Sequence, residues 1–213
     1  MGIINADPFA NAEIAASYEN WYLTIDRGAD QREKDLLKWL LDGFPQACTI
    51  LEVGCGTGHF TRWFGEQGVQ AVGLGRSRAM LGEAIRLDSL VFLQGDALKL
   101  PFPARCIDLV VLITTLEFLP DPIQALGEAI RVARQGLILG VLNAESRLGR
   151  EYKRAGGPIW GAARFFSPGE LKRLIEAIAG GKTSVIWRTT LWQFWPSALP
   201  LSWGGFIGMA VKI

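Results

Sequence analysis

The sequence predicts an α/β fold, with a doubly wound and mainly parallel sheet between helices. Short apolar runs alternate with segments of helical periodicity along most of the chain, as in repeated strand–helix units. Residues 106–113 are apolar almost throughout, which is typical of a strand covered on both faces. Residues 49–53 form a second apolar run, and it leads into a glycine-rich turn and a helix. Such a turn favours a ligand at the helix start, beyond the carboxyl end of the strand.

The composition excludes several classes of function. The 213 residues suffice for one domain with a sizeable core, and a net charge of +1 provides no general attraction to nucleic acid or acidic membranes. Three cysteines without a C-x-x-C pair argue against a disulfide framework or a metal site. No signal peptide is evident. We therefore expect a cytoplasmic location, a small-molecule partner, and no bound metal.

Residues 11–43 read as two helices separated around Gly28. The first contains Tyr18, Trp21 and Tyr22, and the second has leucines at helical spacing. Packing on one helix face explains these aromatic residues, and for Trp21 we prefer that interpretation.

The glycine-rich turn follows the pattern E-x-G-x-G-x-G, formed by Glu52, Gly54, Gly56 and Gly58. Glycine tolerates the positive φ angles of a tight turn and lets a ligand approach the backbone. We expect Thr57 to cap the helix that follows. A dinucleotide-binding loop, G-x-G-x-x-G, needs a glycine at the position occupied by His59.

The stretch Glu52-Val-Gly-Cys-Gly-Thr-Gly58 resembles the first signature of class I S-adenosylmethionine (SAM) methyltransferases, of the small-molecule type 11 or UbiE-like group. The resemblance implies that Glu52 and the glycines cradle the methionine end of the cofactor. It also implies a Rossmann-like sheet of seven strands in the order 3-2-1-4-5-7-6, with an antiparallel closing strand. In this family an N-terminal helix often covers the cofactor, so Tyr18 and Tyr22 become candidates for cofactor or substrate contacts.

Residues 69–74 read as the second strand, and Ser77 caps the next helix. This segment resembles the second signature of the family, except that Gly75 replaces the acidic residue that accepts hydrogen bonds from the ribose. Losing charge-assisted hydrogen bonds costs about 1.5–3 kcal/mol. Arg76 at this strand end also permits an alternative, because an arginine there accommodates the 2′-phosphate of NADP.

Residues 90–93 read as the third strand, followed by Gly95-Asp96-Ala97-Leu98 and Pro101-Phe102. This segment resembles the adenine-binding signature of the family, in which an acceptor pairs the exocyclic amine. A turn cap is the alternative role for Asp96.

The fourth strand, residues 106–113, leads to Thr114, Thr115 and Glu117, at the sheet edge where ligands bind. Relatives often carry histidine where Glu117 stands, so Glu117 is a candidate general base. The alternative is a solvent-facing residue at the entry to the helix that Asp121 caps.

The last third of the chain begins with a strand at residues 136–143 and a basic connection, residues 143–166. A connection this long is commonly functional, and Arg164 is our candidate for orienting an anionic acceptor. A capping box begins the helix after Ser167. Strands at residues 183–190 and 206–212 form a closing hairpin that supplies an antiparallel edge strand. Its aromatic loop, residues 191–203, is too interrupted by proline and glycine for a membrane span.

The expected function is methyl transfer from SAM to a small molecule, by a monomer or homodimer. The alternatives are a SAM-binding protein without turnover and an NADP-dependent oxidoreductase. We expect one domain over residues 1–213, with a lid (1–45), a cofactor-binding core (46–142) and a substrate side (143–213). His59 is expected beside the cofactor. The candidate catalytic residues are Glu117, Tyr18 and Tyr22, and the candidate substrate-binding residues are Arg164 and Thr115. The cofactor-binding positions implied are Glu52, Gly54, Cys55, Gly56, Gly58, His59, Gly75, Arg76, Ser77, Met80, Gly95, Asp96, Ala97, Leu98, Ile113 and Thr114.

Overall fold

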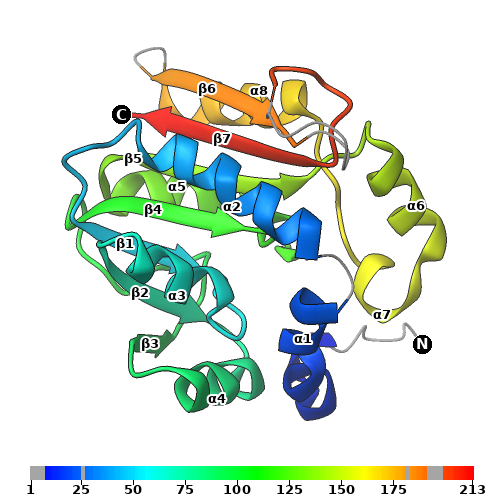
Figure 1. Ribbon diagram of the computed structural model, residues 1–213. Coiled ribbons are helices and arrows are strands. Elements are labelled where there is room, and N and C mark those ends of the chain that lie inside the picture. Colours follow the sequence, from blue (N-terminus) through cyan, green and yellow to red (C-terminus); the bar gives the residue numbers. More distant parts are fainter. Residues whose placement is uncertain (1–7, 25–26, 181–182, 191–198) are drawn as a thin grey trace, which may run out of the picture.

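A computed structural model describes residues 8–24, 27–180, 183–190 and 199–213. Its seven strands form one sheet in the order β3-β2-β1-β4-β5-β7-β6, which confirms the predicted order (Figure 1). The strands are β1 (Thr49–Val53), β2 (Gln70–Gly75), β3 (Val91–Gln94), β4 (Ile107–Ile113), β5 (Ala133–Leu142), β6 (Ser184–Thr189) and β7 (Phe206–Lys212). The predicted fold class, a mainly parallel sheet between helices, is confirmed.

The closing hairpin of β6 and β7 takes the predicted place in the sheet. β7 is antiparallel to both β5 and β6, so it lies inside the sheet and β6 forms the edge. The predicted closing hairpin is therefore confirmed, and its edge strand β6 is antiparallel to its neighbour β7. β5 and β7 pair over seven residues. Each of them has a second hydrogen-bonded neighbour, β4 for β5 and β6 for β7.

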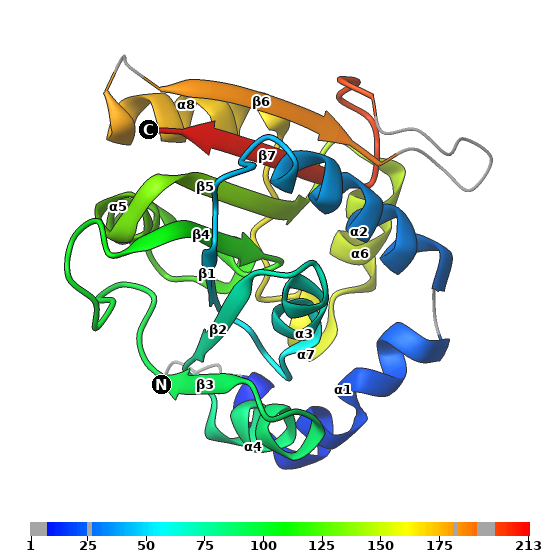
Figure 2. The same cartoon turned by 60° about the vertical axis from the view of Figure 1, so that its left-hand side comes forward.

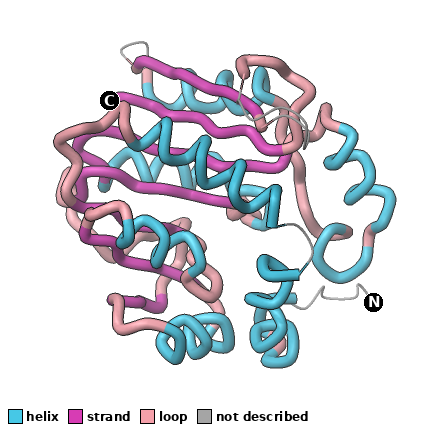
Figure 3. The backbone as a smooth tube through the Cα atoms, viewed as in Figure 1, coloured by secondary structure: helices cyan, strands magenta, loops and turns pink. Residues whose placement is uncertain are grey.

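Helices cover both faces of the sheet, as Figures 2 and 3 show. The alternation along β4 decides which residues face which side: Val110 and Leu112 pack with α5 (Pro122–Val132) and α8 (Pro168–Ala179). Leu109 and Val111 pack with α2 (Arg27–Leu41) and α3 (His59–Glu66). α4 (Arg78–Leu87) packs beside β2 and β3. The central strands therefore are buried on both faces, as their composition predicts.

Several local predictions are confirmed by the capping contacts. The Ser77 hydroxyl accepts a hydrogen bond from the Met80 N–H, and the Asp121 carboxylate accepts one from the Gln124 N–H. Ser167 likewise caps α8. The prediction for Thr57 is wrong, because Gly58 is the N-cap of α3, with φ of 80°, and makes no side-chain capping bond.

The N-terminal and basic segments contain more regular structure than expected. After the short helix η1 (Pro8–Ala10), the N-terminal helices are α1 (Ala12–Thr24) and α2, so Gly28 lies in the first turn of α2 instead of between the helices. The connection after β5 contains α6 (Arg147–Ala155) and α7 (Gly157–Trp160). The side chain of Trp21 and residues 191–198 of the aromatic loop lie outside the described residues.

Two negative findings apply to the described part of the chain. It contains no helix with the length and apolarity needed to traverse a bilayer. It also contains no group of three histidine, cysteine or carboxylate side chains arranged to hold a metal ion.

Candidate functional site

The glycine-rich turn is held between the second strand and the loop after the fourth. The N–H groups of Gly54 and Cys55 both donate to the carbonyl of Leu74, at 2.7 and 3.0 Å. Gly54 has φ of 80°, and a Cβ at this position would lie 2.3 Å from the Thr115 side chain. A Cβ at Gly56, with φ of 54°, would meet nothing within 4 Å. The turn is therefore fixed on one side and open on the other.

The open side faces a cavity of about 790 Å³ at the carboxyl ends of the parallel strands, within the usual volume range of small-molecule sites. Its walls come from the loops after β1, β2, β3 and β4 and from α7, and its roof from η1 and α1. The structure brings nearly all the predicted site residues into this cavity. Only Gly58 of the predicted set does not line it, because its backbone serves as the N-cap of α3.

Glu52 is a buried acid in the wall of the cavity, with 2% of its surface exposed. Its carboxyl accepts a hydrogen bond from the Thr61 hydroxyl. Burial raises the pKa of Glu52 to about 7, although the bond from Thr61 acts in the opposite direction. The carboxyl group can therefore hold a proton near neutral pH.

The end of β2 carries the departure from the family pattern. A Cβ at Gly75 would lie 3.3 Å from the Leu81 side chain and 3.5 Å from the Cys55 sulfur, so the strand end is closely packed. Ser77 donates its hydroxyl proton to the carbonyl of Phe9 at 2.6 Å. This bond ties α4 to η1 and occupies the donor of Ser77.

Asp96 has the turn-capping role that is one of its two predicted roles. Its Oδ1 accepts a hydrogen bond from the Leu98 N–H at 2.9 Å, as a turn cap does. The residue is also exposed and lines the cavity beside Gly95 and Ala97. The capping bond uses one carboxylate oxygen, and its adenine-binding role stays a prediction.

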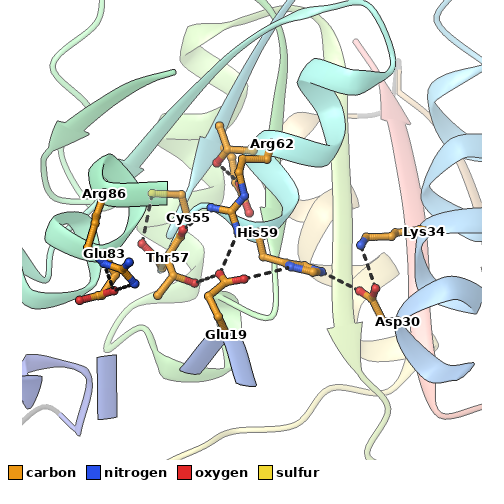
Figure 4. Close-up of polar contacts among 12 residues, drawn as sticks. Glu19, Asp30, Lys34, Cys55, Thr57, His59, Arg62, Glu83 and Arg86 are labelled. Atoms are coloured by element: carbon orange, nitrogen blue, oxygen red, sulfur yellow. Dashed lines mark hydrogen bonds and ion pairs between the residues drawn. The ribbon is translucent and has the colours of Figure 1, made fainter. Parts of the chain in front are cut away.

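Glu19 joins the roof to the glycine-rich turn (Figure 4). Its carboxylate accepts a short hydrogen bond from the Thr57 hydroxyl and pairs with Arg62 Nη2 at 3.0 Å. Its second oxygen lies 3.8 Å from His59 Nδ1. Burial raises the pKa of Glu19, but the bonds from His59 and Thr57 and the charge of Arg62 outweigh burial and lower it to about 2.

His59 extends this network to α2, because its Nε2 lies 2.7 Å from Asp30 Oδ1. Asp30 also pairs with Lys34 at 2.8 Å. Burial lowers the pKa of His59, but the two carboxylates outweigh it, so the pKa is raised above its usual value. The ring of Tyr22 stacks on the imidazole at 3.8 Å. We call the following residues the lid latch: Glu19, Asp30, Lys34, Thr57, His59 and Arg62.

Tyr18 and Tyr22 lie on the cavity side of α1. Their rings meet edge to face, with centroids 5.8 Å apart. Burial raises the pKa of Tyr18 to about 12, so its hydroxyl stays protonated and acts as a hydrogen-bonding group at neutral pH. Their contacts with ligand stay predictions.

Glu117 is buried, with 1% of its surface exposed, so the alternative of a solvent-facing residue is wrong. It lies in the short helix η2 (Leu116–Phe118) and lines the cavity. Its Oε1 accepts the Leu142 N–H at 2.7 Å, and its Oε2 has no hydrogen-bond partner. Burial raises the pKa of Glu117 to about 7.

The two predicted substrate-binding residues both line the cavity. Thr115 donates its hydroxyl proton to the Ile113 carbonyl at 2.9 Å. The Arg164 guanidinium pairs with Glu170 at 2.5 Å and lies 5.0 Å from the centre of the Phe166 ring. Arg164 therefore already has a carboxylate partner, and its role toward an anionic acceptor stays a prediction.

Sequence reasoning missed several cavity residues that are far along the chain from the glycine-rich turn. These include Phe9, Asn11, Phe118 and Pro158 in the lining, and Glu19 behind it. Glu19 is 38 positions from its partner Thr57, and no local pattern marks such a pair. Its place next to Tyr18 on a helix expected to cover the site was the only signal.

Comparisons with known proteins give one consistent similarity. Residues 51–140 match the family described as methyltransferase domain. A malonyl-[acyl-carrier protein] O-methyltransferase of Pectobacterium atrosepticum is 32% identical over 91 residues, which cover 42% of this chain and 36% of that protein. The chain thus spans about a third of the length of this curated relative.

Solved structures extend the similarity to the whole fold. A SAM-dependent methyltransferase of Thermotoga maritima, described as a possible histamine N-methyltransferase, is 28% identical with a TM-score of 0.80, covering 97% of this chain and 99% of that one. The magnesium protoporphyrin IX methyltransferase of Synechocystis, with bound SAH, has a TM-score of 0.72 at 18% identity, covering 97% and 98%. At that identity the second likeness shows the fold alone.

Proposed function

We propose that this chain, whose residues 51–140 match the methyltransferase-domain family and whose fold resembles that of a SAM-dependent methyltransferase of Thermotoga maritima, is a class I SAM-dependent methyltransferase that transfers a methyl group from SAM to a small-molecule acceptor. The observation that carries the proposal is the cavity beneath α1, into which the open face of Gly56 and the acid Glu52 both turn. This arrangement fits the amino-acid end of the cofactor, which needs close backbone approach and polar partners.

The residues of the chain have distinct roles in this proposal. Glu52 and the backbone of Gly54–Thr57 hold the methionine end, Gly75–Ser77 lie beside the ribose, and Asp96 with its neighbours holds the adenine. When bound, SAM supplies an electrophilic methyl group on its sulfonium. The protein aligns the acceptor with that group and excludes water, a contribution of up to roughly 7–11 kcal/mol in favourable intramolecular cases.

The wider organisation is part of the proposal. We infer one domain over residues 1–213, with a lid (1–45), a cofactor-binding core (46–142) and a substrate side (143–213), acting as a monomer or homodimer on a small molecule. The three cysteines, all of them free thiols, support a cytoplasmic location.

Ligand-dependent melting tests the proposed function. Saturating SAM or S-adenosylhomocysteine (SAH) is expected to raise the melting temperature, because a ligand that binds only the folded state stabilises it by about 2.7 kcal/mol at 100 times its Kd. NADPH is expected to leave the melting temperature unchanged. A shift with NADPH alone would support the oxidoreductase, and a shift with SAM but no methylation of any offered compound would support a binding protein.

Replacing Gly56 by alanine is expected to weaken SAH binding by about tenfold or more, or about 1.4 kcal/mol, because Gly56 lines the cavity and a methyl group there would occupy open space that the ligand needs. Gly68→Ala is the matched control, since Gly68 also has a positive φ, of 85°, and open space around it, but does not line the cavity. Calorimetric titration measures both affinities. Equal affinities in the two variants would contradict the placement of the ligand at Gly56.

Gly75→Asp is expected to tighten SAH binding about tenfold, because it restores an acceptor for two ribose hydroxyls. Its Cβ lies 3.3 Å from the end of the flexible Leu81 side chain, which can move by a few tenths of an ångström. Gly75→Asn introduces a side chain of the same size without the charge and is the control. An equal change of Kd in both variants would show that the charge does not reach the ribose.

A further inference from the structure

The free carboxyl oxygen of Glu117 stands apart from the other buried polar groups. Among the described residues, Glu117 Oε2 is the one buried side-chain nitrogen or oxygen atom without a hydrogen-bond partner. Its sister oxygen is anchored by the Leu142 N–H, so the group is held in place. Leaving such a group unpaired costs about 1–3 kcal/mol, and more when it is charged. The absence of a partner inside the protein indicates that a ligand satisfies this oxygen.

No cation in the described part of the chain pairs with Glu117. Arg164, the basic residue lining the cavity near it, is held by Glu170, and His59 is held by Asp30 and Glu19. Arg76 lines the cavity from the opposite group of loops, at the end of β2. The part of the cavity formed by η2 and α7 therefore contains an uncompensated acid.

Aromatic and apolar side chains line the same cavity as this acid. The Phe118 ring meets the Phe9 ring edge to face with centroids 4.9 Å apart, and it lies 6.4 Å from the Trp160 ring. Phe9 also contacts Tyr18, with centroids 6.2 Å apart. Pro158 and Ala162 complete the lining on the side of α7. A cavity that contains both a carboxylate and aromatic rings suits an organic cation, which gains charge pairing and cation–π attraction.

We propose that the methyl acceptor is an amine that enters the cavity as a cation, with Glu117 as its counterion and the surrounding aromatic residues holding its apolar body. This inference rests on the proposed methyl transfer and names the substrate class for it. It assigns the end of the cavity formed by η1, η2 and α7 to the acceptor, while the glycine-rich turn and the loops after β2 and β3 hold the cofactor.

Other classes of acceptor match these residues less well. A hydroxyl group supplies a hydrogen bond to Glu117 but leaves its charge uncompensated in a buried site. A carboxylate acceptor would have to displace Glu170 from Arg164 and would also face the charge of Glu117. A protonated amine supplies both a hydrogen bond and a positive charge.

The same carboxyl group also provides the proton acceptor that an amine needs. A protonated nitrogen has no lone pair, so one proton must leave before the nitrogen can attack. It moves from the nitrogen to Glu117 Oε2, giving a neutral amine and a neutral carboxylic acid without any further reactant. Burial, which raises the pKa of Glu117 to about 7, places this group in the range where general bases operate best.

Binding measurements test the proposal without any need for turnover. With saturating SAH present at pH 8, isothermal titration compares phenethylamine and tryptamine with the neutral analogue 2-phenylethanol and the anion 3-phenylpropanoate. The wild-type protein is expected to bind at least one amine about tenfold or more tightly than either analogue. Glu117→Gln is expected to abolish that preference. Its amide oxygen still accepts the Leu142 N–H, so the fold and the SAH affinity are expected to stay unchanged.

A matched variant separates this effect from a general change of charge. Glu83 pairs with Arg86 within α4 and does not line the cavity, so Glu83→Gln removes one negative charge elsewhere and is expected to keep the preference for amines. In the wild type, amine affinity is expected to fall about tenfold per pH unit below pH 7, because the cation must then displace a proton from Glu117. Glu117→Gln is expected to show a flat profile.

The outcomes distinguish this inference from the proposed function. If SAH binds but neither amine binds more tightly than the neutral analogue, the inference is wrong and the proposed methyl transfer stands. A preference for amines that persists in Glu117→Gln would also overturn it. If SAH itself does not bind, the proposed function fails first.

Discussion

Gly54→Ala is expected to destabilise the protein by roughly 2–5 kcal/mol, the sum of a positive φ and an overpacked contact. The added methyl group would lie 2.3 Å from the Thr115 side chain, which itself is anchored by a hydrogen bond to the Ile113 carbonyl. Neither partner can move away easily, so the turn must shift. We expect SAH affinity to fall about 100-fold, or about 2.7 kcal/mol.

Denaturant unfolding and calorimetric titration measure these two effects separately. Gly68→Ala again provides the control, because its φ of 85° imposes the same backbone strain without a steric overlap. The control is expected to lose about 1–2 kcal/mol of unfolding free energy and to keep its SAH affinity. Similar losses in both variants would mean that strain, and not the contact with Thr115, governs the Gly54 position.

Glu19→Gln is expected to loosen the lid and to raise the Kd of SAH about tenfold, or about 1.4 kcal/mol. The substitution removes the charge that Arg62 and His59 share, and hydrogen bonds to charged groups contribute about 1.5–3 kcal/mol. Amide hydrogen exchange in α1 should quicken by a similar factor, since α1 carries Glu19 and roofs the cavity.

Glu13→Gln is the matched control for the lid latch, because Glu13 is an exposed residue in the first turn of the same helix. It is expected to change neither the Kd of SAH nor the exchange rates. Unaltered exchange in Glu19→Gln would show that aromatic contacts hold the lid without the charged network.

The lid latch also gives stability a predictable dependence on pH. The pKa of His59 is raised, so its contribution is complete below its unfolded value of about 6.5 and disappears as the pH rises through the folded value. The pKa of Glu19 is lowered from 4.5 to about 2, so its contribution is complete above 4.5 and disappears as the pH falls toward 2. The latch therefore contributes most between about pH 4.5 and 6.5.

Much of the fold follows from local sequence patterns whose predicted contacts are present in the structure. The caps at Ser77, Asp121 and Ser167 depend on neighbours within three residues, so the sequence contains both partners of each contact. Strand order followed from a family resemblance, and it is the observed order. Local periodicity does not specify how distant segments pair, so the position of β7 between β5 and β6 follows from that resemblance and not from residue patterns.

In the candidate site too, some features follow from the local sequence and others depend on residues far apart in the chain. Glycine spacing located the turn, because positive φ is a property of single residues and appears in the sequence directly. The Thr57 hydroxyl was expected to cap a helix, but Glu19, 38 residues away, accepts its proton instead. Local pattern allows Glu117 to be either a base or a surface residue, since its burial depends on contacts with the distant strand β5.

The sequence by itself therefore determined the layered fold, the resemblance to a methyltransferase family and the glycine-rich turn, since these depend on periodicity, on glycine and on motifs that are contiguous in the chain. Only the tertiary structure decided that Glu117 lies buried with a free oxygen and that Glu19, His59 and Asp30 hold the lid. The physical reason is that desolvation and charge pairing depend on the groups that folding brings together, whatever their separation along the chain.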